Sequence, residues 1–273
     1  MKRFGLVCHP NIAEAQRLSQ AATVRLKELG VQAWTGSAWE EDELLKRARG
    51  SDLLLSFGGD GTLVRLARLT AGLNIPILGV NLGRVGFLAE LQPNDVVESL
   101  DALAEGRFWL EERMMLRAEL EQDGGTAKPF EAINEVVVSR GRVARIVRIA
   151  AHVDGQYLTT YAADGVIVAS PTGSTAYALA VGGPILNPQL ANLVVVPIAP
   201  HLTVDTALVL PATAHVRLVL STEEEGTLTV DGQVDHPLCD GAVVVVTASS
   251  NLCRFVRMGE RNYFYKTLMQ KIK

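Results

Sequence analysis

The order of apolar runs along the chain changes near residue 107, and this change constrains the fold more than any single motif. Before it, short apolar runs alternate with segments of helical spacing, which predicts an α/β layer with a mostly parallel sheet. After it, strand-like runs follow one another between turn dipeptides such as Asp154-Gly155 and Asp231-Gly232, with runs at 193–198 and, last, at 242–248. That pattern predicts a β-rich, sandwich-like domain. We therefore expect an α/β domain over residues 1–107 and a β-rich domain over 108–273.

Strand and helix signals can be placed along the α/β part. Asn11 is the expected N-cap of the first helix, and Gly30 is the glycine expected to end it. The basic segment 263–273 is expected to form a helix that folds back on the first domain. The expected strands are 4–8, 31–34, 52–57 and 75–80, and the expected helices are 12–29, a helix opening at 40–43, 63–69 and 93–104.

Composition excludes several classes of protein. The chain has 273 residues, of which 48% are hydrophobic and 21% charged, as in ordinary globular proteins. Its net charge of −4 argues against a nucleic-acid partner. No apolar run approaches the ~18 residues of a spanning helix, so no membrane partner is expected. The chain start lacks a signal-peptide pattern, and three widely spaced cysteines favour neither disulfides nor zinc, which together indicate the cytoplasm.

A glycine-rich loop, GGDGT at residues 58–62, lies between an expected strand and an expected helix. Glycines let the backbone approach a ligand, and the helix N-terminus that follows favours an anion such as phosphate. Asp60 is unusual there, because a carboxylate repels phosphate. It therefore suggests a general base or a metal ligand. The alternative is a plain tight turn in which Asp60 only caps the helix.

Two further segments have the polar character of a nucleotide site. Residues 164–177, DGVIVASPTGSTAY, leave a buried strand for a loop of hydroxyl groups and glycine, which suits a base or ribose pocket. The alternative is a Ser/Thr-rich turn. The adjacent amide and carboxylate of Asn134 and Glu135 could hold vicinal ribose hydroxyls, or they could be a solvent-facing pair at a strand start.

These segments, together with Asp231-Gly232-Gln233, occur in the order and spacing of the NAD kinase family, which the chain resembles over nearly its whole length. The resemblance implies transfer of a phosphoryl group from ATP, or from polyphosphate, to the 2′-hydroxyl of the adenosine ribose of NAD. It also implies a divalent cation, Mg²⁺ or Mn²⁺. It further implies a Rossmann-like N-terminal domain, a β-rich C-terminal domain and a homodimer or homotetramer.

The resemblance assigns roles to residues at matching positions. Asp60 would accept the proton of the 2′-hydroxyl, and the phosphate loop would include Gly58, Gly59 and Thr62. Arg65, about one helical turn past the loop, would reach a phosphate. Apart from the resemblance, the basic cluster of Arg140, Arg142, Arg145 and Arg148 is interpreted as a solvated strand edge, in which Arg145 could make a substrate or subunit contact. No protein ligand is assigned to the metal. The other expected substrate contacts are Gly61, Asn134, Glu135, Asp164, Thr175, Ala176, Tyr177 and Gln233.

Two other functions are compatible with parts of the pattern. A diacylglycerol-type lipid kinase shares the GGDGT loop, but no amphipathic membrane-facing stretch accompanies it here. A non-catalytic NAD sensor would need no carboxylate in a phosphate loop. The sequence leaves open the choice between ATP and polyphosphate, allosteric control, dimer versus tetramer, and the use of NADH, for which Ala162 occupies the discriminating position of the family.

Overall fold

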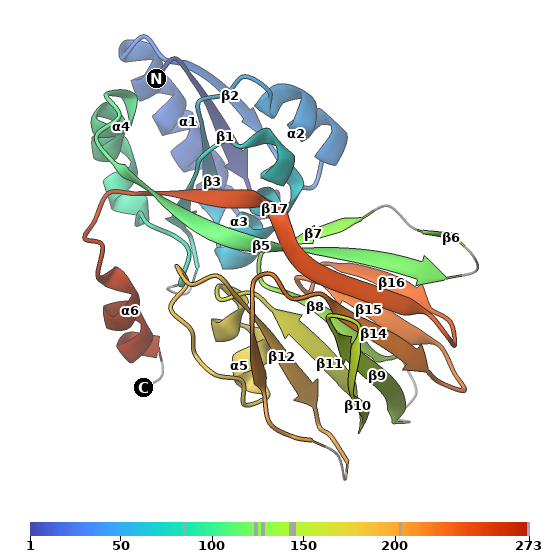
Figure 1. Cartoon of the computed structure of the whole chain (residues 1–273). Helices are drawn as coiled ribbons and strands as arrows, with labels where there is room; N and C mark the ends of the chain where they lie inside the picture. Colours follow the sequence, from blue (N-terminus) through green and yellow to red (C-terminus); the bar gives the residue numbers. More distant parts are fainter. Residues whose placement is uncertain (84–85, 123–124, 127–128, 142–145, 202–203, 272–273) are drawn as a thin grey trace. The chain divides into compact units, whose positions relative to one another are not determined.

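A computed structural model describes residues 1–83, 86–122, 125–126, 129–141, 146–201 and 204–271 (Figure 1). The chain divides into two compact units. The first comprises Met1–Glu112 and Leu252–Lys273, and the second comprises Arg113–Asn251. The predicted fold class, an α/β part followed by a β-rich part, is confirmed.

The first unit contains a parallel sheet in the order β4-β3-β1-β2. All six residues of β3 are buried, as in a strand covered on both faces. Because the chain reverses its direction of travel across the sheet after β2, a topological switch point lies between β1 and β3. The elements are β1 (Arg3–Cys8), α1 (Ala13–Glu28), β2 (Gln32–Gly36), α2 (Glu41–Ala48), β3 (Leu53–Gly58), α3 (Asp60–Thr70), η1 (Ala71–Leu73), β4 (Ile77–Asn81), η2 (Pro93–Asp95) and α4 (Val96–Ala104).

Helix α1 buries one apolar stripe against the sheet, at the helical spacing of Ala15, Leu18, Ala22 and Leu26. The expected cap at Asn11 is wrong. Ile12 occupies the N-cap position without a side-chain hydrogen bond, and the backbone N–H of Asn11 donates to His9 Nδ1 at 3.2 Å. The helix end therefore relies on tertiary packing rather than on a polar cap.

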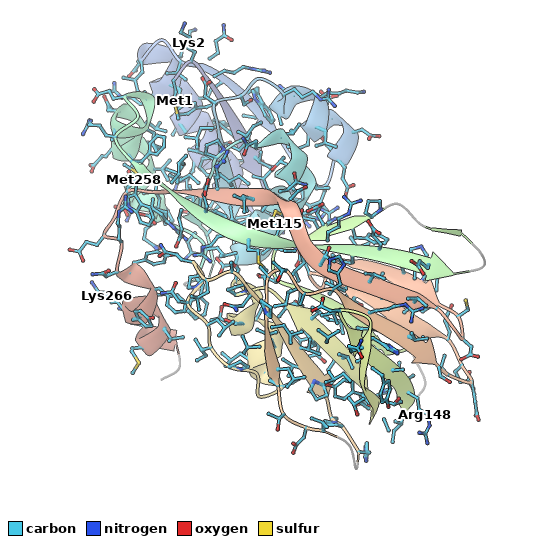
Figure 2. All side chains as sticks on the ribbon, in the orientation of Figure 1. Met1, Lys2, Met115, Arg148, Met258 and Lys266 are labelled. Atoms are coloured by element: carbon cyan, nitrogen blue, oxygen red, sulfur yellow. The ribbon has the colours of Figure 1, made fainter. Side chains whose placement is uncertain are left out.

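Two long strands, β5 (Trp109–Gln122) and β17 (Val243–Arg257), run from one unit into the other. The sequence suggested that the last strand ends near Ala248, but β17 continues to Arg257. Its final part joins the first unit, where Phe255 pairs in parallel with Ile77 of β4. Helix α6 (Tyr263–Lys271) follows in the same unit and carries Lys266, as Figure 2 shows with the side chains drawn.

Arg257, at the end of β17, is only 1% exposed. Its guanidinium donates hydrogen bonds to Glu111 Oε2, to the carbonyl oxygen of Leu88 and to the Tyr263 hydroxyl, each at 2.8 Å. The Tyr263 hydroxyl in turn donates to Glu111. This buried cluster links β5, β17, α6 and the segment after β4 within the first unit.

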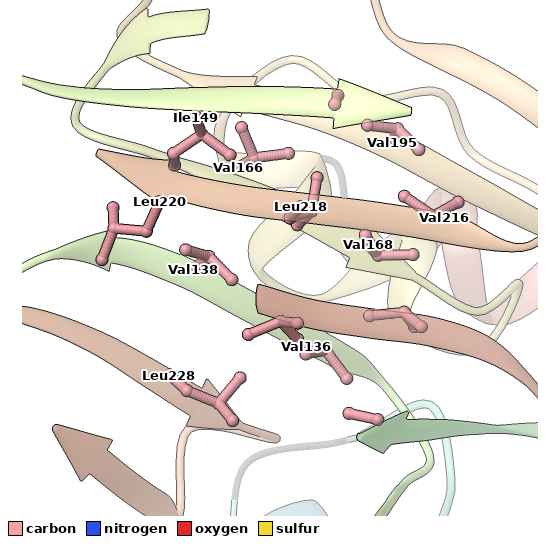
Figure 3. Close-up of a cluster of buried hydrophobic side chains, with 14 of the residues drawn as sticks. Val136, Val138, Ile149, Val166, Val168, Val195, Val216, Leu218, Leu220 and Leu228 are labelled. Atoms are coloured by element: carbon pink, nitrogen blue, oxygen red, sulfur yellow. The ribbon is translucent and has the colours of Figure 1, made fainter. Parts of the chain in front are cut away.

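The second unit has two antiparallel sheets, β13-β12-β11-β8-β15-β16 and β10-β9-β14-β17, with β5 paired to β6 and β7. Alternate residues such as Val136 and Val138 of β8, or Val166 and Val168 of β11, form its core (Figure 3). The bounds are β6 (Gly125–Thr126), β7 (Phe130–Ala132), β8 (Glu135–Arg140), β9 (Val147–Val153), β10 (Gln156–Ala163), β11 (Gly165–Ala169), η3 (Gly173–Thr175), α5 (Tyr177–Ala180), β12 (Asn192–Ile198), β13 (Leu208–Pro211), β14 (Val216–Ser221), β15 (Gly226–Val230) and β16 (Val234–Leu238).

None of the helices in the described part of the chain combines the length and the apolar character that crossing a bilayer requires.

Candidate functional site

The glycine loop places Asp60 at the first position of α3, directly after β3. Oδ2 of Asp60 accepts a hydrogen bond of 2.7 Å from the backbone N–H of Phe87. Oδ1 is buried and has no hydrogen-bond partner among the described residues. A Cβ on Gly86 would overlap the Asp60 carboxylate, so glycine is required where the two segments meet. One carboxylate oxygen is thus held in place while the other keeps its capacity to accept a proton.

The glycines of the loop differ in how much space surrounds their Cα atoms. A Cβ on Gly58 would collide with the side chain of Thr62, which is buried beneath the loop. A Cβ on Gly59 or Gly61 would meet nothing within 4 Å. Open space therefore lies beside the middle of the loop, where the backbone and the start of α3 favour a phosphate group.

Arg65 has partners within the first unit. Its Nε donates to the carbonyl oxygen of Ala38 at 2.8 Å, and its Nη2 bonds Glu41 Oε1 at 2.8 Å. The guanidinium also lies over the ring of Trp39, 5.3 Å from its centroid. In this structure Arg65 holds the start of α2, so the expected phosphate contact stays a prediction.

A cavity of about 480 Å³ in the second unit brings together Glu135, Asp164 and Tyr177. Glu135, Val137 and Ser139 alternate along β8, and all three line the cavity, as the two-residue period of a strand dictates. Glu135 is 5% exposed, which rules out the solvent-facing alternative for this residue. The cavity volume is within the range of small-molecule sites.

Asp231 organises the edge of this cavity. Its carboxylate accepts hydrogen bonds from the backbone N–H groups of Ile133, Asn134 and Glu135, at 3.0, 2.8 and 3.1 Å. Asp231 itself has a left-handed backbone, φ 51°, in the expected turn before Gly232. The sequence pointed to this residue only as a turn and as part of the family pattern, because the partners lie almost a hundred residues away.

Glu135 has an unusual electrostatic environment. Burial, and then the neighbouring Asp231 carboxylate, raise the pKa of Glu135 from 4.5 to about 8. The backbone N–H of Tyr177 donates to the Glu135 carboxylate and acts in the opposite direction. Glu135 Oε2 is buried without a hydrogen-bond partner in the described structure. A buried acceptor of this kind is suited to a ligand hydroxyl.

Asp164 forms an ion pair with Arg140, whose Nε lies 2.9 Å from Asp164 Oδ1. Both side chains line the cavity. Sequence reasoning placed Arg140 in a solvated basic cluster and missed it as a site residue. Its position at the end of β8, the strand that begins with Glu135, was the available signal.

The hydroxyl-rich segment serves two purposes. Ser170 and Ser174 are fully buried. Their hydroxyls donate to the backbone carbonyls of Ile133 and Pro171, at 2.5 and 2.7 Å. These hydroxyls therefore stabilise the loop itself. The following residues, Thr175, Ala176 and Tyr177, are less buried, and Tyr177 lines the cavity.

Two remaining residues complete the expected set. Gln233 lies just after the Asp231 turn, where its backbone N–H donates to Val230 O at 3.0 Å. Arg145 lies outside the described residues. The glycine loop belongs to the first unit and the cavity to the second.

Comparison with known proteins agrees with this pattern. Residues 4–108 match the ATP-NAD kinase N-terminal domain, and residues 133–258 match the ATP-NAD kinase C-terminal domain. An NAD kinase of Dehalococcoides mccartyi (strain CBDB1) is 40% identical over 273 residues, covering 100% of this chain and 96% of the relative. An NAD kinase of Heliobacterium modesticaldum is 45% identical over 232 residues, covering 85% and 82%.

Solved structures show the same fold. A yeast NADH kinase complexed with NADH has a TM-score of 0.89 at 23% identity, covering 100% of this chain and 87% of the other. An NAD kinase from Archaeoglobus fulgidus in complex with ATP has a TM-score of 0.76 at 26% identity, covering 98% of both chains. Both domains, the matched relatives and the motifs within them agree, and the chain belongs to the ATP-NAD kinase family.

Proposed function

We propose that the chain transfers the terminal phosphoryl group of ATP to the 2′-hydroxyl of the adenosine ribose of NAD, giving NADP, with Asp60 as the proton acceptor. The prediction that the chain is an NAD kinase is confirmed by its family. The observation that carries the role of Asp60 is its geometry. One oxygen is held by Phe87 N–H, and the other is buried and unpaired at the start of α3.

The chemistry follows from this arrangement. A ribose hydroxyl is a poor nucleophile, and a carboxylate within hydrogen-bond reach takes its proton as the phosphoryl group arrives. Phosphoryl transfer otherwise depends on positioning and on charge stabilisation. The open side of the glycine loop and the N-terminus of α3 provide a place for the phosphates.

The cavity of the second unit is the proposed dinucleotide site. Glu135 Oε2 supplies a buried acceptor for a ribose hydroxyl, and Asn134 is held beside it by Asp231. Asp164, paired with Arg140, would face the nicotinamide half. Thr175, Ala176 and Tyr177 would contact the adenine and its ribose. A yeast NADH kinase with this fold was solved with NADH, which agrees with a dinucleotide as the substrate.

A divalent cation, Mg²⁺ or Mn²⁺, fits this site as a companion of the donor. The described residues include no group of three or more His, Cys, Asp or Glu side chains that could hold a metal ion. Mg²⁺ commonly binds substrate phosphates and keeps several waters, so it does not need such a group. When bound, it would neutralise charge on the phosphates, and no protein ligand is assigned to it.

Assembly as a homodimer or homotetramer in the cytoplasm is part of the proposal and rests on the family resemblance. Most apolar side chains of the strands at 193–198 and 242–248 are buried within the second unit, so the proposed assembly does not rest on these strands. Light scattering at assay concentration, with activity measured on dilution, tests the assembly. A fully active monomer would contradict it.

One assay tests the activity. The protein is incubated with Mg²⁺, with ATP or polyphosphate as donor, and with NAD, NADH or diacylglycerol as acceptor, and the phosphorylated product is measured. NADP formation is expected with ATP. Phosphorylation of diacylglycerol in place of NAD would identify a lipid kinase. Binding of NAD without turnover would identify a sensor.

A further inference from the structure

We propose that Arg257, at the end of β17, is a positioning residue that orients the carboxylate of Asp60 through the segment of residues 86–91. This inference rests on the proposed role of Asp60 and deepens it by naming what holds that side chain. All the residues concerned belong to the first unit. The segment lies between β4 and η2 and belongs to neither, so its shape depends on contacts with other parts of the unit.

The first residues of the segment contact the proposed base directly. The backbone N–H of Phe87 donates to Asp60 Oδ2 at 2.7 Å, and a Cβ on Gly86 would overlap the same carboxylate. A displacement of the segment would therefore move or break the hydrogen bond that orients Asp60. The position of Oδ1, the oxygen proposed to take the proton, depends on the segment as well as on the glycine loop.

The next residue of the segment is bonded to Arg257. Nη1 of Arg257 donates to the carbonyl oxygen of Leu88 at 2.8 Å and lies 3.2 Å from Glu90 Oε2. Glu90 Oε1 accepts from the backbone N–H groups of Met258 and Gly259, each at 2.8 Å. The hydrogen bond to Arg257 and the hydrogen bond to Asp60 are thus carried by adjacent residues, Leu88 and Phe87.

The surroundings of Arg257 fix the direction of its donors. Nε donates to Glu111 Oε2 and Nη2 to the Tyr263 hydroxyl, each at 2.8 Å, within a buried cluster. A guanidinium is planar, with its N–H donors in a fixed geometry. Hydrogen bonds on Nε and Nη2 therefore determine where Nη1 points, which is at the Leu88 carbonyl.

Helix α6 contacts the same segment. The ring centroids of Phe87 and Phe264 lie 6.3 Å apart with an interplanar angle of 42°, and Phe264 is buried. Aromatic rings at such a separation attract each other beyond their buried area. The residue before it, Tyr263, donates to Glu111 in the Arg257 cluster. The C-terminal part of the first unit therefore holds the segment both at Leu88 and at Phe87.

Arg257→Lys tests this role with the positive charge retained. Lysine can still oppose Glu111, but it lacks the planar fork that bonds Leu88 and Tyr263 at the same time. We expect kcat to fall by about 10–100-fold, the range for a small misplacement of a catalytic group. KM for ATP and KM for NAD should stay at their wild-type values, because the segment is proposed to orient the base rather than to bind substrate.

Two further variants frame this result. Arg254→Lys is the matched control on the same strand, because Arg254 bonds Glu112 and Asn74, which lie outside residues 86–91, and it should retain kcat. Phe264→Leu keeps an apolar side chain on α6 but removes the ring that faces Phe87, and it should lower kcat. Thermal melting identifies the folded variants, and Phe264→Leu decides alone if Arg257→Lys does not fold. Wild-type kcat in the folded variants would overturn the proposal.

A double variant separates positioning of Asp60 from a general structural role. If Arg257 acts through Asp60, adding Arg257→Lys to Asp60→Asn should not lower the remaining kcat further, because the base is already lost. Residues that act independently give additive effects on the free energy, and therefore fold-changes that multiply. The full 10–100-fold loss of kcat in the Asp60→Asn background would show that Arg257 does not act through the base, and would overturn the proposal.

Hydrogen exchange separates a failure of this inference from a failure of the proposed function. Backbone exchange is measured in the full-length wild type, Arg257→Lys and Arg254→Lys without substrates. Only Arg257→Lys should speed exchange at residues 86–91, with exchange in β3 unchanged. That result supports the positioning role even if the wild type forms no NADP, in which case only the kinase proposal fails. Equal exchange at residues 86–91 in all three proteins overturns the role of Arg257 regardless of turnover.

Discussion

The backbone N–H of Phe87 donates a hydrogen bond of 2.7 Å to Oδ2 of Asp60. This bond orients the carboxylate of the glycine loop and leaves Oδ1 for a substrate proton. The segment after β4 thus controls the side chain on which the proposed chemistry depends.

Asp60→Asn should separate geometry from proton transfer. The amide oxygen can still accept from Phe87 N–H, so the loop should keep its shape and NAD affinity should be retained. Loss of the base should lower kcat by ~10²–10⁴-fold. Steady-state kinetics together with NAD calorimetry measure both quantities. A near-wild-type kcat would remove Asp60 from its role as base.

Gly86→Ala should lower kcat because the new Cβ would overlap the Asp60 carboxylate and displace it. Gly83→Ala is the control on the same segment, since a Cβ there meets nothing within 4 Å. We expect Gly83→Ala to retain wild-type kcat. If the two variants behave alike, the contact between Gly86 and Asp60 does not matter for turnover.

Asp231→Asn should weaken NAD binding, because an amide cannot accept from all the backbone N–H groups of Ile133, Asn134 and Glu135. The expected loss is ~1–3 kcal/mol, the cost of an unsatisfied buried donor. Asp154→Asn is a matched control.

Asp154 also precedes a glycine and has a left-handed backbone, φ 52°, but it is exposed, and its carboxylate accepts a hydrogen bond from the backbone N–H of His215. Calorimetry with NAD should show a change only for Asp231→Asn. Equal affinities in both variants would mean that the Asp231 hydrogen bonds do not shape the dinucleotide site.

Glu135→Gln should change how stability depends on pH. Because the pKa of Glu135 is raised from 4.5 to about 8, the folded protein binds more protons than the unfolded chain between these values. The free energy of unfolding therefore falls as pH rises through this window. Glutamine does not titrate, so the variant should gain a few kcal/mol over wild type between pH 4.5 and about 8. Urea unfolding at several pH values measures this gain, and parallel pH profiles would contradict it.

Arg257→Met should destabilise the first unit by ~3–5 kcal/mol, because it leaves Glu111 buried and without its ion-pair partner. Arg254→Met is the control. Its ion pair with Glu112 is partly exposed, so its loss should cost no more than ~1 kcal/mol. Urea unfolding of the two variants gives the comparison. Similar losses of stability in the two variants would show that burial of the Arg257 cluster does not determine its contribution to the free energy of unfolding.

Local patterns were sufficient for the strands of the α/β unit and for the turn at Asp231. They were insufficient where contacts between residues far apart in the sequence determine where an element begins or ends. The sequence put the start of the third helix at Leu63, but it begins at Asp60, because the backbone N–H groups of Thr62 and Leu63 both reach Gly59 O. The last strand extends beyond Ala248 because β4 offers it a pairing edge, which alternating polar residues do not reveal.

The same limit applies to the candidate site. Glu135 was predicted from its position beside Asn134 and from the family pattern. A base or ribose pocket was expected, but the sequence did not show which residues line the cavity. Arg140 was missed, because its pairing with Asp164 depends on strands β8 and β11 lying side by side. Arg65 was expected at a phosphate because helix geometry allows that reach. Its observed partners, Ala38 and Glu41, lie at the start of another helix, and sequence spacing does not show that this start packs beside Arg65.

The passage of β17 back into the first unit has a consequence for the order of events during synthesis. Residues Arg113–Asn251 leave the ribosome as one continuous unit and can complete their own core at once. The N-terminal sheet emerges earlier, yet the strand beside β4 and the Arg257 that bonds Glu111 are made only after the second unit. Domains usually fold from the N-terminus during translation. In this chain the unit whose synthesis begins first is completed only when β17 reaches β4, so Glu111 meets its partner Arg257 after the whole second unit has been made.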